Sequence, residues 1–256
     1  MAQLRLIALA ALAACGHGPK LTPASQPDVE LARARRDFHR GDCTHATVSL
    51  RRLSFELGPT QPELAEVHYY LAECFFQTGD KVQAAHEFRQ VADQYPTSDY
   101  APLALLRAGD ANLRLWRRPE LDPTYGQSAL AIYQELAGRY PGTSAAARAQ
   151  QHVQQLREWF AEKDYKNGMF YLKHFGVHAY DSAIIYFKDV IASYPGTSRV
   201  PDALMRLVEI YRAIHYADEL KETCTHLRRF YPQAAGLEKT CPADASGGTA
   251  SAPAPS

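Results

Sequence analysis

The sequence carries no excess of charge of either sign, since 28 Lys and Arg residues stand against 28 Asp and Glu residues. A nucleic-acid-binding protein needs a concentration of positive charge, so this balance argues against nucleic acid as the main partner. The same balance argues against attachment to an acidic lipid surface by charge alone. No run alternates apolar and polar residues for long enough to predict a β-strand.

The sequence also lacks the familiar motifs of catalysis. It has no Gly-x-Ser-x-Gly, Ser-x-x-Lys or His-Glu-x-x-His motif and no glycine-rich phosphate-binding loop. His174 and His178 have the spacing of two metal ligands on a helix, but Gly176 lies between them and no third ligand is evident. We therefore expect a protein that is not an enzyme and that holds neither a metal nor another cofactor.

One short phrase recurs along the chain. Residues 95–98 read Tyr-Pro-Thr-Ser, residues 140–144 and 194–198 read Tyr-Pro-Gly-Thr-Ser, and residues 231–232 keep Tyr-Pro. Because Pro cannot donate a backbone hydrogen bond, each copy predicts the end of a helix. The successive Tyr residues are 45, 54 and 37 residues apart. A helix end that recurs in this way predicts a stacked array, an architecture that usually binds other molecules.

Residues 64–96 give the clearest copy of the repeated unit. Its small, turn, aromatic and terminating residues follow the spacing of the roughly 34-residue tetratricopeptide repeat. They are Ala72, Gly79, Ala84, Phe88, Val91 and Pro96. Gly79 suits the turn between two helices because it accepts a positive φ, and the small Ala residues let the paired helices approach closely.

The other copies follow the same pattern more loosely. The first copy lacks a closing Pro, and the third carries about nine extra residues at 116–124 between its helices. The fourth copy follows an unusually long helical run from Ser144 to about Lys173. We therefore predict an all-α fold, a right-handed α-solenoid of about five tetratricopeptide-like helix pairs, in which most consensus residues pack between helices.

The two ends of the chain fall outside this pattern. Residues 1–14 combine Arg5 with an apolar run of nine residues, which is typical of a secretory signal peptide and too short to span a bilayer. Residues 15–27 are rich in Gly, Pro and Ser and predict a flexible tether, whereas residues 242–256 have little apolar bulk and predict a disordered tail. The solenoid is then expected at residues 28–241.

The predicted signal peptide ends in Leu-Ala-Ala-Cys at residues 12–15, which resembles the bacterial lipobox. In that motif the Cys becomes the lipidated first residue, so Cys15 is the predicted lipidation site; the alternative is an ordinary signal peptide with a chance Cys. Two or more acyl chains hold a protein on a membrane stably without a transmembrane helix. In lipoproteins an Asp after the Cys favours the inner membrane, so Gly16 implies the outer membrane in a Gram-negative host.

Four further cysteines, Cys43, Cys74, Cys224 and Cys241, would meet an oxidising compartment after export. Four cysteines allow three connectivities, and pairing between neighbours is favoured because Cys43 and Cys74 fall near the same end of adjacent repeats. Cys224 and Cys241 would then hold the chain end against the last helix. The alternative is that all four act as small buried apolar residues.

Groove-facing positions of the first helix in each repeat predict the binding surface. Counted from the consensus, these positions are Arg35, Phe38, His39, Glu66, Tyr69, Glu73, Phe76, Gln77 and Asn112. Aromatic side chains beside amide and charged groups suit an extended peptide, whose side chains and backbone they can bind together. For Phe38 and Phe76 a place in the core is an equally good interpretation.

Two features go beyond the generic repeat. The insertion at residues 117–124 looks like the Arg- and Asp-rich third-repeat insertion of the BamD family, where Asp122 and Thr124 match best. The long helical run and the residues after it also match, at Leu156, Ala161, Glu162, Phe170, Tyr171, Tyr180, Ala183, Tyr194 and Pro195. Over about residues 28–232 the chain thus resembles the assembly-factor lipoproteins of the outer-membrane β-barrel assembly machinery. It departs from them in its extra cysteines and its Ala- and Pro-rich tail.

The resemblance implies a non-enzymatic role at the periplasmic face of the outer membrane. The amino-terminal repeats would bind unfolded outer-membrane proteins through their terminal targeting segment. The carboxy-terminal repeats would dock a BamA-like barrel subunit through its periplasmic domains. A different interpretation stays open, in which the chain is an envelope scaffold lipoprotein that coordinates cell-wall enzymes.

Overall fold

The computed structural model of the 256-residue chain describes residues 26–117 and 122–242. The predicted signal peptide, the predicted lipidation site Cys15 and most of the predicted tether lie outside the described residues. Four residues of the third-repeat insertion and nearly all of the predicted tail also lie outside them.

The described residues form successive pairs of helices. The pairs are α1 (Pro27–His39) with α2 (Cys43–Glu56), α3 (Glu63–Thr78) with α4 (Lys81–Gln94), α5 (Tyr100–Leu115) with α6 (Thr124–Arg139), α7 (Ser144–Phe175) with α8 (Tyr180–Ser193), and α9 (Arg199–Ala213) with α10 (Ala217–Phe230). A short 3₁₀ helix, η1 (Gly176–Ala179), joins α7 to α8, and a last turn, α11 (Leu237–Thr240), follows α10. Every regular element among the described residues is helical, which confirms the all-α repeat prediction.

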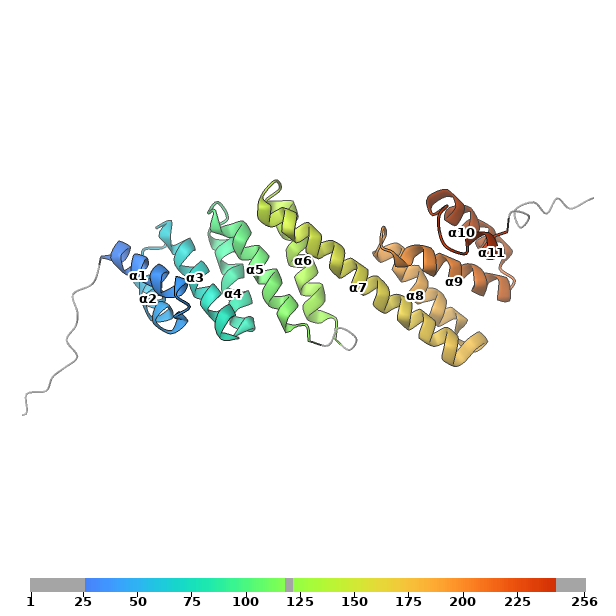
Figure 1. The fold of residues 1–256 in the computed structure, drawn as a ribbon, viewed down its shortest axis with the longest axis horizontal. Helices are drawn as coiled ribbons and strands as arrows, with labels where there is room; N and C mark the ends of the chain where they lie inside the picture. The colour runs from blue at the N-terminus through green and yellow to red at the C-terminus, as the bar shows by residue number, and fades with distance from the viewer. Residues whose placement is uncertain (1–25, 118–121, 243–256) are drawn as a thin grey trace, which may run out of the picture.

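The pairs lie side by side in an elongated row that runs from α1 to α11, and the long α7 crosses the middle of the row (Figure 1). Each helix packs against the next one along the chain. In addition, the first helices of neighbouring pairs touch one another, α1 against α3, α3 against α5, α5 against α7 and α7 against α9. The first helices therefore form one continuous layer, on which all of the predicted groove residues lie.

The recurring Tyr-Pro phrase ends four helices in the same way. Tyr95, Tyr140, Tyr194 and Tyr231 are the residues that close α4, α6, α8 and α10, each with φ between −125° and −132° and ψ between 50° and 56°. The backbone N–H of each still bonds to a carbonyl four residues earlier. The Pro that follows disfavours the helical conformation in the residue before it, and the helix stops there.

The turns inside the pairs use left-handed residues followed by an N-cap. Gly41 and Gly79 have φ of 80° and 101°, and His215 takes this place in the fifth pair with φ of 60°. After the glycines, Asp42 and Asp80 each accept a hydrogen bond of 3.1 Å from a backbone N–H in the first turn of α2 and α4. These caps satisfy N–H groups that have no partner inside the helix.

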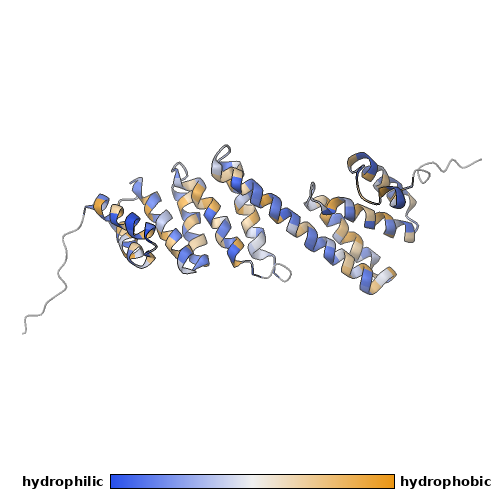
Figure 2. Cartoon of the chain, viewed as in Figure 1, coloured by the Kyte–Doolittle hydropathy of each residue, from blue (hydrophilic) through white to orange (hydrophobic). Residues whose placement is uncertain are grey.

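The core follows the helix pairs. Small Ala residues at the close approaches of the helices are fully buried, among them Ala72, Ala84, Ala108, Ala129 and Ala183. Phe88, Tyr133 and Phe187 hold equivalent places in α4, α6 and α8 and are also fully buried. Figure 2 shows apolar and hydrophilic positions alternating around the helices, the pattern expected when one stripe of each helix packs and the other meets water.

Gly109 in α5 marks the tightest of these approaches. A Cβ at this position would lie 2.4 Å from the Tyr133 ring, so Gly109→Ala is expected to lower the free energy of unfolding by about 1–3 kcal/mol through overpacking. Gly138 in α6 is the matched control, because a Cβ there meets nothing within 4 Å. Gly138→Ala should be neutral or stabilising by up to about 1 kcal/mol, since Ala favours the helix.

Urea unfolding of both variants, followed by circular dichroism, measures the difference. Equal stability of the two variants would contradict the close packing of α5 on α6.

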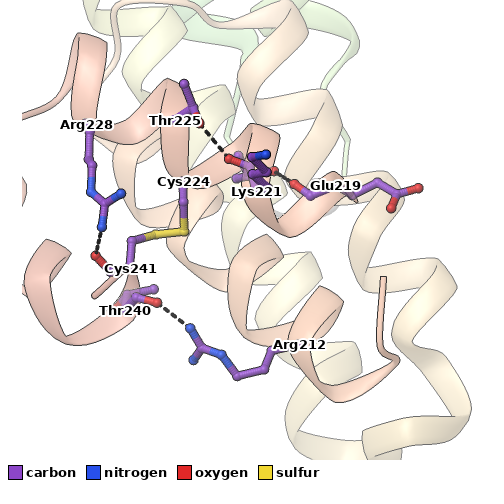
Figure 3. The surroundings of a disulfide bond; sticks show 9 residues. Arg212, Glu219, Lys221, Cys224, Thr225, Arg228, Thr240 and Cys241 are labelled. Carbon is purple, nitrogen blue, oxygen red and sulfur yellow. Dashed lines mark hydrogen bonds between the residues drawn. A yellow bond between two sulfur atoms is a disulfide. The ribbon is translucent and has the colours of Figure 1, made fainter. Parts of the chain in front are cut away.

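The structure contains one of the two expected disulfides. Cys224 in α10 is bonded to Cys241, which directly follows α11 (Figure 3). Cys43 and Cys74 are free, buried thiols, so the neighbour pairing expected between them is not present. Burial and the adjacent Cys43 raise the pKa of the Cys74 thiol, which disfavours the thiolate that disulfide formation requires.

Within the described ranges, no helix is both long enough and apolar enough to cross a membrane.

Candidate functional site

Ion pairs cross from one first helix to the next along the predicted groove. Arg35 of α1 forms a two-point contact with the Glu66 carboxylate of α3. Glu73 of α3 accepts two hydrogen bonds, of 2.5 and 2.7 Å, from Arg107 of α5. A two-point contact between a planar guanidinium and a carboxylate fixes the distance and the relative orientation of the two groups. These ion pairs therefore help to fix the position of each first helix relative to the next.

Glu66 lies at the edge of a small hollow. The hollow has a volume of about 290 Å³ and is lined by Arg35, Glu66 and Tyr100, among others. Burial and the nearby Glu66 raise the pKa of the Tyr100 phenol, so it stays protonated and can donate a hydrogen bond. This end of the groove therefore offers a carboxylate, a guanidinium and a phenol close together.

Glu73 is the centre of a larger polar network. Tyr69 donates a hydrogen bond of 3.2 Å to Glu73, and Arg107 also contacts Asp110 at 3.1 Å. Asp110 in turn accepts a bond of 2.8 Å from the Tyr133 hydroxyl. Burial alone would lower the pKa of Arg107, but the hydrogen bonds and charge of Glu73 raise it. The guanidinium is therefore charged at all relevant pH values.

Phe76 lies between two cations. The Lys81 ammonium is 3.8 Å from the centre of its ring, and the Arg107 guanidinium carbon is 4.0 Å from it. Cations attract the face of an aromatic ring, and such contacts are worth about 0.5–2 kcal/mol. Phe76 is half-buried, so it lines the hollow with one part of its side chain and packs against the core cluster around Ala84 and Phe88 with another. Its neighbour Gln77 is exposed and lies 3.5 Å from the Cys43 thiol.

The remaining predicted groove residues, Phe38, His39 and Asn112, are less well placed to bind a peptide. Phe38 is half-buried, packs against the amino-terminal core cluster and lies 4.9 Å from the Tyr70 ring. His39 is exposed beside these two rings. Asn112 is half-buried and donates its side-chain N–H to the Ala108 carbonyl of its own helix, which leaves it little capacity for a ligand.

Sequence reasoning missed a second group of groove residues farther along the row. Arg107, Arg114, Arg148, Trp116 and Trp159 line a hollow of about 580 Å³ together with Phe76. Trp159 offered a usable signal, because it is one of only two tryptophans and lies in the long fourth-repeat helix. The arginines gave no signal of their own, since isolated arginines are common on any solvated helix.

The residues that the structure describes contain no group of three or more His, Cys, Asp and Glu side chains that could hold a metal ion. His174 instead contacts the Phe170 carbonyl in its own helix at 3.0 Å.

A comparison with known protein families places the chain in one of them. The family model YfiO, described as an outer membrane lipoprotein, matches residues 24–227. The chain belongs to this family. The match runs from the first helix pair into α10, and it confirms the resemblance to the BamD family that the insertion and the long helix predicted.

One relative of this chain is the outer membrane protein assembly factor BamD of Caulobacter vibrioides. The two are 34% identical over 111 residues, which is 43% of this chain and 35% of the relative. The aligned part thus spans about a third of the relative's length.

Solved structures that align with this chain include a thermophilic tetratricopeptide repeat protein of Thermus thermophilus. It is 18% identical, has a TM-score of 0.39 and aligns over 84% of this chain and 96% of its own. A double mutant of MamA RS-1 is 15% identical, with a TM-score of 0.42, over 84% and 95% of the two chains. Because both scores lie below 0.5, the fold assignment rests on the helix pairs of this chain.

Proposed function

We propose that this protein is a non-enzymatic lipoprotein of the outer-membrane β-barrel assembly machinery, anchored through Cys15 at the periplasmic face of the outer membrane. The observation that carries the proposal is the family match over residues 24–227, supported by the identity to an assembly factor over 111 residues. The function also needs no catalytic motif, in keeping with the sequence.

The first three repeats suit the reception of unfolded outer-membrane proteins. Arg35, Glu66, Tyr69 and Glu73 present charged and phenolic groups along one layer of helices, and Phe76 adds an aromatic face. An unfolded chain offers backbone N–H and C=O groups together with apolar side chains, and this surface can satisfy both. The ion pairs between repeats hold the surface ready before a chain binds, which reduces the entropic cost of binding.

The carboxy-terminal repeats would dock a BamA-like barrel subunit. Support comes from exposed apolar side chains at the end of α7 and just beyond it: Phe170, Phe175 and Val177 are each at least half exposed. The rings of Phe170 and Phe175 lie 6.1 Å apart. Exposed apolar groups that gather at one place commonly mark a protein interface.

Affinity purification tests the proposal against the scaffold alternative. The full-length chain carrying a carboxy-terminal tag is isolated from detergent-solubilised membranes of its native host, and the recovered partners are identified by mass spectrometry. The expected partner is a barrel protein with periplasmic repeat domains. Recovery of peptidoglycan synthases without any barrel protein would contradict the assembly role and favour the cell-wall scaffold.

A further inference from the structure

The 580 Å³ hollow in the middle of the row has a composition unlike the rest of the chain. It lies where the end of α3, the second half of α5 and α7 meet. Arginine dominates its charged lining, and Asp110 is the acidic residue there. The whole chain has a formal net charge of zero, so positive charge is concentrated locally at this place.

Three of the four arginines that line this hollow have no acidic partner in the described part of the chain. Arg107 is neutralised by Glu73 and Asp110. Arg114, Arg117 and Arg148 are exposed and form no ion pair with a described residue. Lys81, which sits over the Phe76 ring, adds a further cation. Burial lowers the pKa of Lys81, and the charges of Arg107 and Arg114 lower it further, as expected where cations crowd together.

Two indole rings, those of Trp116 and Trp159, line the hollow. Trp116 is buried and fixed, because its indole N–H donates to the Asp122 carbonyl at 2.8 Å and its ring stacks on Phe160 at 5.2 Å. Trp159 lies 5.5 Å from Trp116 and is 54% exposed. A large aromatic ring held half in water on a rigid neighbour is a ready surface for another aromatic side chain.

A second hollow, of about 440 Å³, shares both tryptophans with the first. Both tryptophans line it, and the α7 residues Lys163 and Lys166 stand at its rim. Lys166 is paired with Glu162 at 3.2 Å, whereas Lys163 forms no ion pair with a residue of the described ranges. Because the two hollows share the Trp pair, they form one path, and each of them is also lined by a cation without an acidic partner among the described residues.

We propose that this path, named here the Trp-Arg groove (Phe76, Arg114, Trp116, Arg148, Trp159 and Lys163), binds an acidic extended peptide segment that carries an aromatic residue. The aromatic side chain would stack on Trp159, and carboxylates on either side of it would meet Arg114, Arg148 and Lys163. A lipid fits less well, since acyl chains need a broad apolar face and the lining of the 580 Å³ hollow is about half polar. The inference does not rest on the assembly role, because it follows from this groove alone.

Intrinsic fluorescence tests the proposal directly, because both tryptophans of the chain line the groove. The purified full chain is titrated with synthetic ten-residue peptides that contain no Trp. One peptide has four Glu residues around a central Phe, a second has Gln in place of each Glu, and a third has Ala in place of Phe. The acidic Phe peptide should shift the Trp emission and bind at least tenfold more tightly than either of the others. Its affinity should fall as salt rises.

Matched variants locate the site. Arg114→Gln combined with Arg148→Gln should weaken binding of the acidic Phe peptide at least tenfold. Arg36→Gln combined with Arg229→Gln removes the same charge from exposed positions in α1 and α10 and should change the affinity less than twofold. Circular dichroism checks that both variants keep the helical content of the parent protein.

Three results would overturn the proposal. They are equal binding of the Glu and Gln peptides, unchanged binding by the Arg114→Gln/Arg148→Gln variant, and an emission shift with phosphatidylglycerol vesicles but with no peptide. Because these titrations use purified protein and defined peptides, their failure is distinct from a failure to recover a barrel subunit from membranes.

Discussion

Replacing Cys15 with Ser is expected to move nearly all of the protein from the membrane fraction to the soluble fraction of the periplasm. Each acyl methylene that enters a bilayer contributes about 0.8 kcal/mol, so two or more chains give effectively permanent attachment. Without them the described helices offer no span that could replace the anchor. Fractionation of host cells followed by immunoblotting measures the shift.

Cys43→Ser is the control for this prediction. It removes a cysteine from α2 but leaves the lipobox-like residues 12–15 intact, so that variant should remain in the membrane fraction. If the parent protein and the Cys15→Ser variant fractionate alike and mass spectrometry finds no lipid on the parent protein, residues 1–15 act as an ordinary signal peptide.

Replacing Cys241 with Ser is expected to loosen the carboxy-terminal end of the row by about 3 kcal/mol. The disulfide closes a loop with a sequence separation of 17 residues, and a loop of this size is worth about 3 kcal/mol in the chain-entropy model. The segment also depends on Arg228, which donates to the Cys241 carbonyl at 2.6 Å, and on Arg212, which donates to the Thr240 carbonyl (Figure 3). Both hydrogen bonds are lost if the segment around α11 detaches from α9 and α10.

Hydrogen exchange measures this effect repeat by repeat. Protection in α10 should fall about 100-fold in the Cys241→Ser variant, while α1 to α4 should keep their protection, because stacked repeats contact only their neighbours. Cys74→Ala provides the opposite control, with changes confined to the amino-terminal pairs. An unchanged α10 in the Cys241 variant would show that the Arg212 and Arg228 contacts hold the end without the disulfide.

The fold was predictable because each repeat marks its own ends. Tyr95-Pro96 and its later copies stop the helices, Gly79 turns the chain, and small residues such as Ala72 and Ala84 permit close packing. These are local rules of backbone geometry, so they hold without knowledge of the partner helix. His215 shows the limit of such rules, since a His takes the left-handed position where Gly is expected.

The candidate sites were only partly predictable because they depend on which helices meet. Arg35, Glu66 and Glu73 followed from repeat positions, but Arg107, the partner of Glu73, did not, because it lies 34 residues away on the next first helix. Trp116 and Trp159 come together only because the long α7 packs beside α5. Cysteine pairing likewise was not fixed by position in the sequence, since Cys224 is bonded to Cys241 whereas Cys43 and Cys74 are free thiols although they fall on adjacent repeats.

The assembly role is tested most directly by the amount of folded β-barrel protein in the outer membrane after this chain is depleted from its native host. Folded barrels resist unfolding in detergent at room temperature and migrate faster in gels than the boiled protein. Depletion should lower the folded fraction of several barrel proteins severalfold, and the full-length chain should restore it. Undiminished folded barrels, accompanied by altered cell-wall composition, would contradict the assembly role.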